Sequence, residues 1–358
     1  ADFVMDFLQR SNTASARRIV RGGILPESGE RAQIILSGVS SDNDIERARI
    51  MCTFFLADMA RFISETVDSS FALAKYAERI SVSAETFAPV EDEVLKDNII
   101  TEMYYSLLRA EIEKYNPDIF AVSIPFPGTL VNALRALRFV RDNYPEITRC
   151  AGGGFVNTEL RNIREKKFFD YAQYMTLDDG EKPLLNIIKK ARGESYSFKR
   201  TFFIEDEKIV FRDSDEADAK IYEGFYADYS DIDTTRYLML SDNINPMLSM
   251  WNSDFYLKMT LAHGCYWKKC AFCDTSLDYI CRFEPETSEG AAGKIEKLVK
   301  ETGINSFHFT DEAAPPALLR ELSLELIRRK LSISWWGNIR FEKSFSLDMA
   351  RLLSVAGC

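Results

Sequence analysis

The segment DIFAVSIPFPGTLVNALRALRFVRDNYPEITRCAGGG, residues 118–154, predicts an α/β fold. It opens with the apolar run Asp118–Ile124, which is typical of a strand buried on both faces of a parallel sheet. After a loop rich in Pro and Gly, helical periodicity extends from about Leu130 to Asn143. A second strand, Ile147–Ala151, then ends at the three glycines 152–154. This alternation predicts βαβ units, with helices on both faces of the sheet.

The flanking sequence extends this first α/β region on both sides. A strand over Tyr171–Leu177 is followed by a helix that ends near Gly193. Two apolar runs around a polar turn in Arg200–Arg212 predict a β-hairpin. Residues 213–254, rich in Asp, Ser, Tyr and Asn, are predicted to form a linker. Upstream, we expect helices over Asp44–Ile63 and Ile99–Tyr115 and a short strand over Gln33–Leu36.

A second alternating region begins at Tyr256 and contains three βα units. Its predicted strands cover residues 256–260, 305–309 and 332–336, and its predicted helices cover residues 287–301, 317–330 and 347–355. The sequence therefore predicts a first domain over residues 1–195, a hairpin and linker over 196–254, and a second α/β domain over 255–358.

Composition narrows the class of protein. The 358 residues include 45 Lys and Arg and 55 Asp and Glu, and this net charge of −10 argues against a large nucleic-acid surface. No apolar run is long enough to span a bilayer. Four of the seven cysteines lie between Cys265 and Cys281, which is a poor disulfide framework and suits a reducing cytoplasm. With only two histidines, a His-rich metal site is excluded.

The strongest chemical signal is HGCYWKKCAFCD, residues 263–274, directly after a predicted strand. Cys265, Cys270 and Cys273 form a C-x4-C-x2-C pattern within nine residues. Thiolates of this kind hold iron–sulfur clusters, and three of them on a four-iron cluster leave one iron open for an outside ligand. Two alternatives remain: a structural zinc site completed by His263 or Cys281, and ordinary buried cysteines.

At these residues the sequence resembles the radical S-adenosylmethionine (SAM) enzymes, whose signature is C-x3-C-x2-C with an aromatic residue before the last cysteine. Phe272 holds the aromatic place, while the first gap is one residue longer, as in a subset with GCYW-type loops. The resemblance implies a [4Fe-4S] cluster on Cys265, Cys270 and Cys273, with SAM on the open iron. It also implies reductive cleavage of SAM to a 5′-deoxyadenosyl radical, with electrons from a partner such as flavodoxin or ferredoxin.

The same resemblance implies SAM contacts at the ends of the next two strands. Asp311 or Glu312 would accept the SAM amino group, because an ammonium needs an anionic acceptor. Asn338 and Arg340 follow the third strand, and Arg340 could hold the SAM carboxylate. The structural alternatives are a helix N-cap at Asp311 and a surface ion pair at Arg340.

The first α/β region resembles cobalamin-binding Rossmann-like domains, which carry a Ser-x-Leu element and a later Gly-Gly pair. Here Ser123 is followed by Gly152, Gly153 and Gly154, and glycine lets the backbone approach a flat cofactor closely. The alternative is a tight βα turn. The Asp-x-His-x-x-Gly element that supplies a lower cobalt ligand is absent, since neither histidine lies in this region.

The wider resemblance, over most of residues 63–358, is to cobalamin-binding-domain radical SAM proteins. It implies a Rossmann-like cobalamin-binding-type domain followed by the first half of a radical SAM partial (βα) barrel. We therefore expect the chain to be an internal fragment. The implied activity is cobalamin-dependent methyl transfer or peptide modification, on a peptide or a small molecule. A cobalamin-independent radical SAM enzyme and a non-catalytic, zinc-stabilised binding module are the alternatives.

Overall fold

A computed structural model describes the chain in two compact units. The described residues are 2–26, 30–38, 40–73, 86–219, 226–237, 255–271, 273–343 and 345–358. One unit comprises residues 60–219, and the other comprises residues 1–59 together with 220–358. Each unit is described by itself below. The domain boundaries expected at residues 195 and 254 stay predictions.

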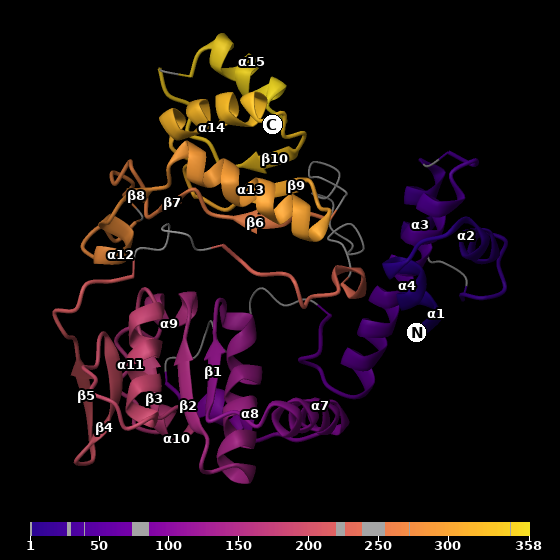
Figure 1. Cartoon of the computed structure of the whole chain (residues 1–358). Helices are drawn as coiled ribbons and strands as arrows, with labels where there is room; N and C mark the ends of the chain where they lie inside the picture. Colours follow the sequence, from indigo (N-terminus) through magenta and orange to yellow (C-terminus); the bar gives the residue numbers. More distant parts are fainter. Residues whose placement is uncertain are drawn as a thin grey trace. The chain divides into compact units, whose positions relative to one another are not determined.

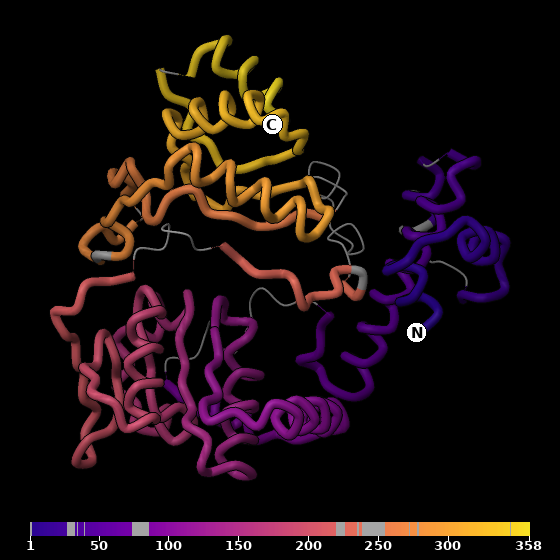
Figure 2. Tube along the Cα trace, in the orientation of Figure 1, coloured from indigo at the N-terminus to yellow at the C-terminus, as the bar shows by residue number. Residues whose placement is uncertain are grey.

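The unit of residues 60–219 is built on a five-stranded sheet of order β1-β2-β3-β4-β5 (Figure 1). Its first three strands run parallel, as predicted, and its last two form an antiparallel hairpin paired to β3. The strands are β1 (Ile119–Ser123), β2 (Thr148–Gly152), β3 (Tyr174–Thr176), β4 (Thr201–Glu205) and β5 (Lys208–Arg212). The predicted hairpin therefore forms, and it extends the sheet (Figure 2).

Six helices of this unit lie within the described residues. They are α6 (Ala88–Val94), α7 (Ile99–Tyr115), α8 (Pro127–Asn143), α9 (Gly154–Thr158), α10 (Phe168–Tyr171) and α11 (Glu181–Ala191). Asn98 caps α7 through a capping box with Thr101, and Asn116 ends it in the left-handed conformation. Leu134 and Leu137 of α8 pack in one core with Met175 of β3. Because burial of apolar area is the main driving force, this core holds the sheet and its helices together.

Strand β1 corrects one expectation. Its apolar sequence predicted burial on both faces, but Ala121 and Ser123 are exposed. Within the described sheet β1 is an edge strand, and a run of apolar residues does not reveal a strand's place in the sheet.

The N-terminal helices within the described residues share one core, which includes Phe7, Ile19 and Cys52. They are α1 (Asp2–Gln9), α2 (Thr13–Val20), α3 (Glu30–Ser37) and α4 (Asp44–Thr66). The predicted helix over Asp44–Ile63 is confirmed, whereas the strand predicted at Gln33–Leu36 is wrong because these residues belong to α3. A four-residue apolar run does not distinguish a strand from a turn of helix.

The C-terminal region contains the three predicted βα units. Its parallel sheet has the order β10-β9-β6, from β6 (Leu257–Met259), β9 (Ser306–Phe309) and β10 (Ser334–Gly337). The helices after these strands are α13 (Ser288–Thr302), α14 (Pro316–Arg328) and α15 (Leu347–Val355). Phe307 and Trp335 pack against Ile295 and Leu319 in one core. Sequential parallel strands, each followed by a helix, occur in open α/β sheets and in (βα) barrels alike.

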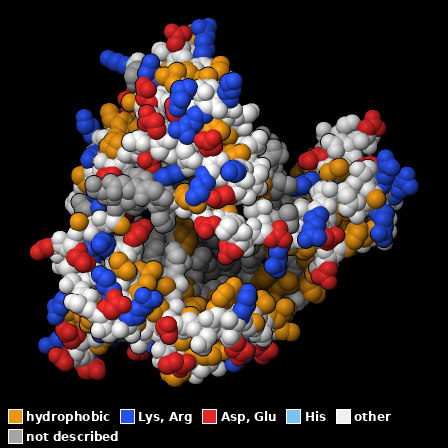
Figure 3. Space-filling view, in the orientation of Figure 1, with side chains coloured by type: hydrophobic (Ala, Val, Ile, Leu, Met, Phe, Trp, Pro, Cys, Tyr) orange, Lys and Arg blue, Asp and Glu red, His pale blue; other side chains and the backbone are white. Residues whose placement is uncertain are grey.

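The outer helices of this region are polar. Basic and acidic side chains are interspersed over α13 and α14 (Figure 3), and Arg329 pairs with both Glu296 and Glu325. Mixed charge of this kind is typical of a solvated helical face. Among the described helices, none has the length and apolar character needed to cross a membrane.

Candidate functional site

The three cysteines lie in a loop that folds back on itself between two paired strands. β7 (Ala262–His263), before the loop, pairs with β8 (Glu284–Pro285), after it, and the short helix α12 (Asp278–Cys281) lies between them. Gly264 has φ +70°, and a Cβ there would overlap the carbonyl oxygen of Arg282. Glycine is therefore required at the point where the loop leaves β7.

The structure brings the three cysteines together. Burial raises the pKa of the Cys273 thiol, and the neighbouring thiols of Cys270 and Cys265 raise it further. The charge of the Glu312 carboxylate raises the pKa of this thiol as well. The amide of Cys273 also donates to the Cys270 carbonyl at 3.3 Å, in a tight turn. The loop thus presents three partly buried thiols, and the exposed Glu312 carboxylate follows β9.

A single ion and a cluster make different demands on the donor side chains. Across the described ranges, no three or more His, Cys, Asp or Glu side chains gather closely enough to hold one metal ion. A lone zinc ion needs such a gathering of four donors, whereas each thiolate of a four-iron cluster binds a different iron. His263, a fourth ligand in the zinc alternative, has Nε2 3.0 Å from Nη2 of Arg282. Phe272, the expected aromatic neighbour, lies outside the described residues.

Asp311 holds the backbone that leads into this loop. Its buried carboxylate accepts hydrogen bonds from the amides of Leu261, at 2.8 Å, and Ala262, at 2.7 Å. Burial raises the pKa of Asp311, and these backbone hydrogen bonds oppose the rise. The N-cap of α14 is Pro315, so Asp311 is not the helix cap considered above. Both carboxylate oxygens of Asp311 thus accept hydrogen bonds from the backbone of Leu261 and Ala262. Of the two neighbouring acidic residues, Glu312 is the one whose side chain is exposed.

Arg340 contacts the cysteine loop itself. Its guanidinium carbon lies 3.5 Å from the centroid of the Trp267 ring, and its Nε lies 3.2 Å from Oε1 of Glu342. The same Oε1 accepts a hydrogen bond of 2.6 Å from the Tyr266 hydroxyl. Burial and this carboxylate raise the pKa of Tyr266 to about 12, and the hydrogen bonds from Tyr266 and Arg340 lower that of Glu342. Arg340 thus forms an ion pair, which was the structural alternative to a SAM contact. Its partner, Glu342, is hydrogen-bonded to Tyr266 of the cysteine loop.

Sequence reasoning missed Glu342 and the contacts of Tyr266 and Trp267. Asn338, an expected cofactor contact, is exposed, and its carbonyl accepts from the Ala314 amide at 2.9 Å. The only sequence signal for Glu342 is a charge two residues after Arg340. That signal is weak, because neighbouring opposite charges are common on solvated surfaces.

In the other unit, Ser123 and the three glycines lie at the carboxyl ends of β1 and β2. Gly153 has φ +108°, and a Cβ there would lie 2.7 Å from the amide nitrogen of Ile124. A Cβ on Gly152 would lie 2.8 Å from Oγ1 of Thr176. Contacts within the protein therefore explain why Gly152 and Gly153 have no room for a Cβ. The same edge of the sheet stays the predicted cobalamin-facing edge.

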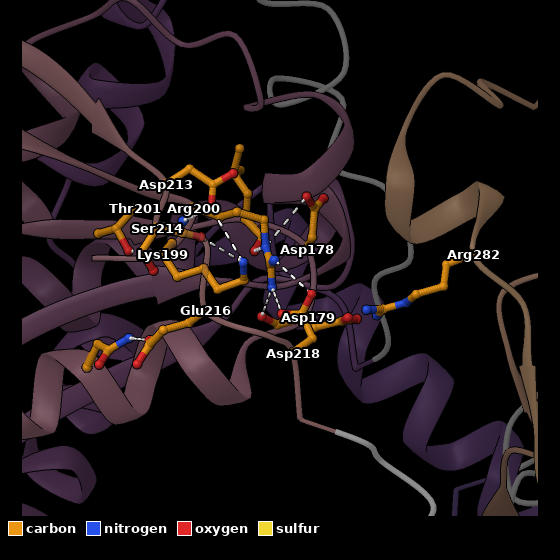
Figure 4. Close-up of polar contacts among 12 residues, drawn as sticks. Asp178, Asp179, Lys199, Arg200, Thr201, Asp213, Ser214, Glu216, Asp218 and Arg282 are labelled. Carbon is orange, nitrogen blue, oxygen red and sulfur yellow. Dashed lines mark hydrogen bonds and ion pairs between the residues drawn. The ribbon is translucent and has the colours of Figure 1, made fainter. Parts of the chain in front are cut away.

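A half-buried polar network lies at the end of β3 in the same unit (Figure 4). Asp178, at φ 61°, receives two hydrogen bonds from Arg161, at 2.5 and 3.1 Å, and lies 3.8 Å from Arg200. Arg200 also forms a two-bond pair with Asp218, at 2.5 and 3.1 Å. Its Nη2 donates to the Asp179 carbonyl as well. These pairs neutralise the acidic turn after β3 and fix its shape.

A cavity of about 350 Å³ lies elsewhere in this unit, between the first turns of α7 and α8 and the turn at residues 68–73. Tyr104, Asn132 and the buried Arg135 are among its lining residues. None of the predicted site residues lines it, so the cavity and the predicted cofactor edge are separate features.

The glycine edge makes a first prediction. Gly153→Ala should destabilise the unit by about 3 kcal/mol, because Gly153, at φ 108° and ψ 177°, lies in a backbone region that only glycine adopts readily and an added Cβ would overlap the Ile124 backbone. Gly193→Ala is the matched control, since Gly193 has φ +71° with nothing near its Cβ position, and should cost about 1 kcal/mol. Thermal or urea unfolding of both variants measures the difference. Equal stability losses would contradict the overlap.

The comparisons with known proteins concern the fold. No family model matches the chain, and no curated protein matches it. Among solved structures, it matches the radical SAM methyltransferase TsrM from Kitasatospora setae, determined with cobalamin and a [4Fe-4S] cluster bound. The TM-score is 0.51 at 16% identity, over 71% of this chain and 51% of TsrM. The chain thus spans about half the length of TsrM, and its fold is similar to that of this cobalamin-binding radical SAM methyltransferase.

Proposed function

We propose that this chain carries the cofactor-binding part of a radical SAM enzyme that performs cobalamin-dependent methyl transfer or peptide modification. The observation that carries the proposal is the C-x4-C-x2-C loop, in which Cys265 and Cys270 act electrostatically on the Cys273 thiol, as does the Glu312 carboxylate. The cysteine loop follows the first strands of a βα series and Glu312 follows β9, at positions where ligands of parallel α/β sheets commonly bind.

Each residue would have a distinct part in this site. The three cysteines would hold a [4Fe-4S] cluster, with one thiolate on each of three irons. When bound, such a cluster supplies the electron for reductive cleavage of SAM to a 5′-deoxyadenosyl radical. Glu312, exposed beside Cys273, would accept an ammonium group of SAM, and Asp311 would hold the backbone behind the loop.

Cobalamin is the further cofactor of this proposal. The similarity of fold to TsrM supports it, as does the place of Ser123 and Gly152 at the carboxyl ends of β1 and β2. No histidine lies in the unit of residues 60–219, so a lower cobalt ligand from a histidine of that unit is excluded. The substrate would be a peptide or a small molecule, and the electron donor a flavodoxin or ferredoxin.

Anaerobic purification with iron, sulfide and corrin quantified together tests the proposal. We expect about four iron and four sulfide per chain after reconstitution, a retained corrin absorbance band, and 5′-deoxyadenosine when SAM and a reductant are added. One zinc and no iron would overturn the proposal in favour of a zinc-stabilised binding module. Iron without corrin would instead leave a cobalamin-independent radical SAM enzyme.

A further inference from the structure

Four residues join the cysteine loop to the segment after β10, and one of them, Arg340, is also a predicted SAM contact. Tyr266 and Trp267 follow the first cysteine, and Arg340 and Glu342 follow the third strand of the region. One oxygen, Oε1 of Glu342, accepts both the Tyr266 hydroxyl at 2.6 Å and Arg340 Nε at 3.2 Å. The guanidinium carbon of Arg340 lies 3.5 Å from the centroid of the Trp267 ring, which is a cation–π contact.

These contacts differ from an ordinary surface ion pair. The side chains of Arg340 and Glu342 are 33% and 26% exposed, so the pair is only partly hydrated. A phenol donating to a carboxylate forms a charge-assisted hydrogen bond, which is shorter and stronger than a neutral one. Because the guanidinium face is covered by Trp267, the same arginine is fixed by two different kinds of contact.

The contacts also span a long stretch of sequence. Tyr266 and Glu342 are 76 residues apart, whereas the hydrogen bonds of Cys273 and Thr275 within the loop are local turns. Local turns set the curvature of a loop but do not fix it to the sheet. The bond from Tyr266 therefore restrains a loop residue adjacent to Cys265 against a distant segment.

We propose that Tyr266, Trp267, Arg340 and Glu342, here called the loop clasp, are positioning residues that hold the three-cysteine loop in place for its cofactor. The functional part of this inference, that the clasp helps the loop hold its cofactor, rests on the proposed function. The mechanical part, that the clasp restrains the loop, concerns the metal-free chain. Glu342 is the central member, since its single oxygen Oε1 receives both hydrogen bonds.

Hydrogen–deuterium exchange of the metal-free full chain tests the mechanical part. Glu342→Gln keeps an oxygen acceptor and removes the charge, and Tyr266→Phe removes only the hydroxyl. In each variant, amides of residues 264–271 should exchange about three- to tenfold faster, the scale expected for one weakened charge-assisted hydrogen bond. The double variant should exchange little faster than either single one, because both changes break the same contact.

Matched controls separate the clasp from general effects. Glu321→Gln alters an exposed glutamate paired with Arg320 on α14, and Tyr237→Phe alters an exposed tyrosine of the same unit. Both should leave exchange in the loop unchanged. The amides of β9 should stay equally protected in every variant, which excludes global unfolding. Unchanged exchange of residues 264–271 in Glu342→Gln would overturn the clasp, whatever the chain binds.

Reconstituted protein supplies the second readout. In Glu342→Gln we expect iron loss to a chelator to be about three- to tenfold faster than in the unaltered chain. The electron paramagnetic resonance spectrum of the reduced protein should also change, because the loop residues next to the cluster move. Faster exchange with an unchanged spectrum and unchanged iron loss would overturn the cofactor role. If the unaltered chain takes up no iron, the proposed function fails, and the exchange result still decides the mechanical part.

Discussion

Cys270→Ser should abolish iron–sulfur binding while leaving the metal-free fold intact. Cys270 is one of three neighbouring thiols, and serine offers an oxygen where iron–sulfur clusters require thiolate. The residue is only partly buried and lies outside the core built on Phe307 and Leu319, so little packing is lost. We expect iron to fall from about four to below one per chain, and 5′-deoxyadenosine formation to disappear.

The remaining cysteines of the C-terminal half serve as controls for this result. Cys281→Ser and Cys358→Ser alter cysteines of the same unit that lie outside the C-x4-C-x2-C pattern, and both should retain full iron. The circular dichroism and melting temperature of metal-free Cys270→Ser should match those of the unaltered chain. Loss of metal in Cys281→Ser equal to that in Cys270→Ser would identify a four-cysteine site and contradict the three-ligand cluster.

Gly264→Ala should disrupt the same loop through the backbone alone. Gly264 has φ +70°, and an added Cβ would overlap the carbonyl oxygen of Arg282, which lies two residues before β8. Backbone cannot rotate away as a side chain can, so β7 and β8 would have to separate. We expect a loss of about 3 kcal/mol in the free energy of unfolding, together with loss of iron binding.

Gly303→Ala is the matched control for this variant. Gly303 ends α13 at φ +72°, nearly the same backbone angle, with nothing within 4 Å of its Cβ position. It should cost about 1 kcal/mol, the strain of a left-handed alanine without any overlap. The difference in urea or thermal stability between the two variants isolates the contact with Arg282. Full iron uptake by Gly264→Ala would contradict the tight closure of the loop.

Most of the regular structure could be predicted from local patterns. The helical period over residues 99–115 and the βα alternation after residue 256 appear in the structure with shifts of a few residues at their ends. Helix periods and strand runs are properties of neighbouring residues, so they are readable before tertiary contacts form. The strand expected at Gln33–Leu36 failed because it rested on four residues, too few to carry a period.

The candidate site likewise has features that motif spacing predicts and features that only the fold decides. The C-x4-C-x2-C spacing predicts a thiolate site, and in the structure Cys265 and Cys270 act electrostatically on the Cys273 thiol. Spacing could not assign roles to Asp311 and Glu312, because adjacent residues on a chain can face different environments. Only the fold directs Asp311 to the amides of Leu261 and Ala262 and leaves Glu312 exposed near Cys273.

By itself, the sequence determined the α/β class, the order of the main strands and helices in the two α/β regions, and the cysteine motif with its three thiols. The tertiary structure alone decided that the hairpin extends the first sheet, that β1 lies at an edge, and that Glu342 meets Tyr266. The reason is physical. Periodicity and motif spacing depend on residues a few positions apart, whereas these contacts join residues separated by tens of positions, and only packing brings them together.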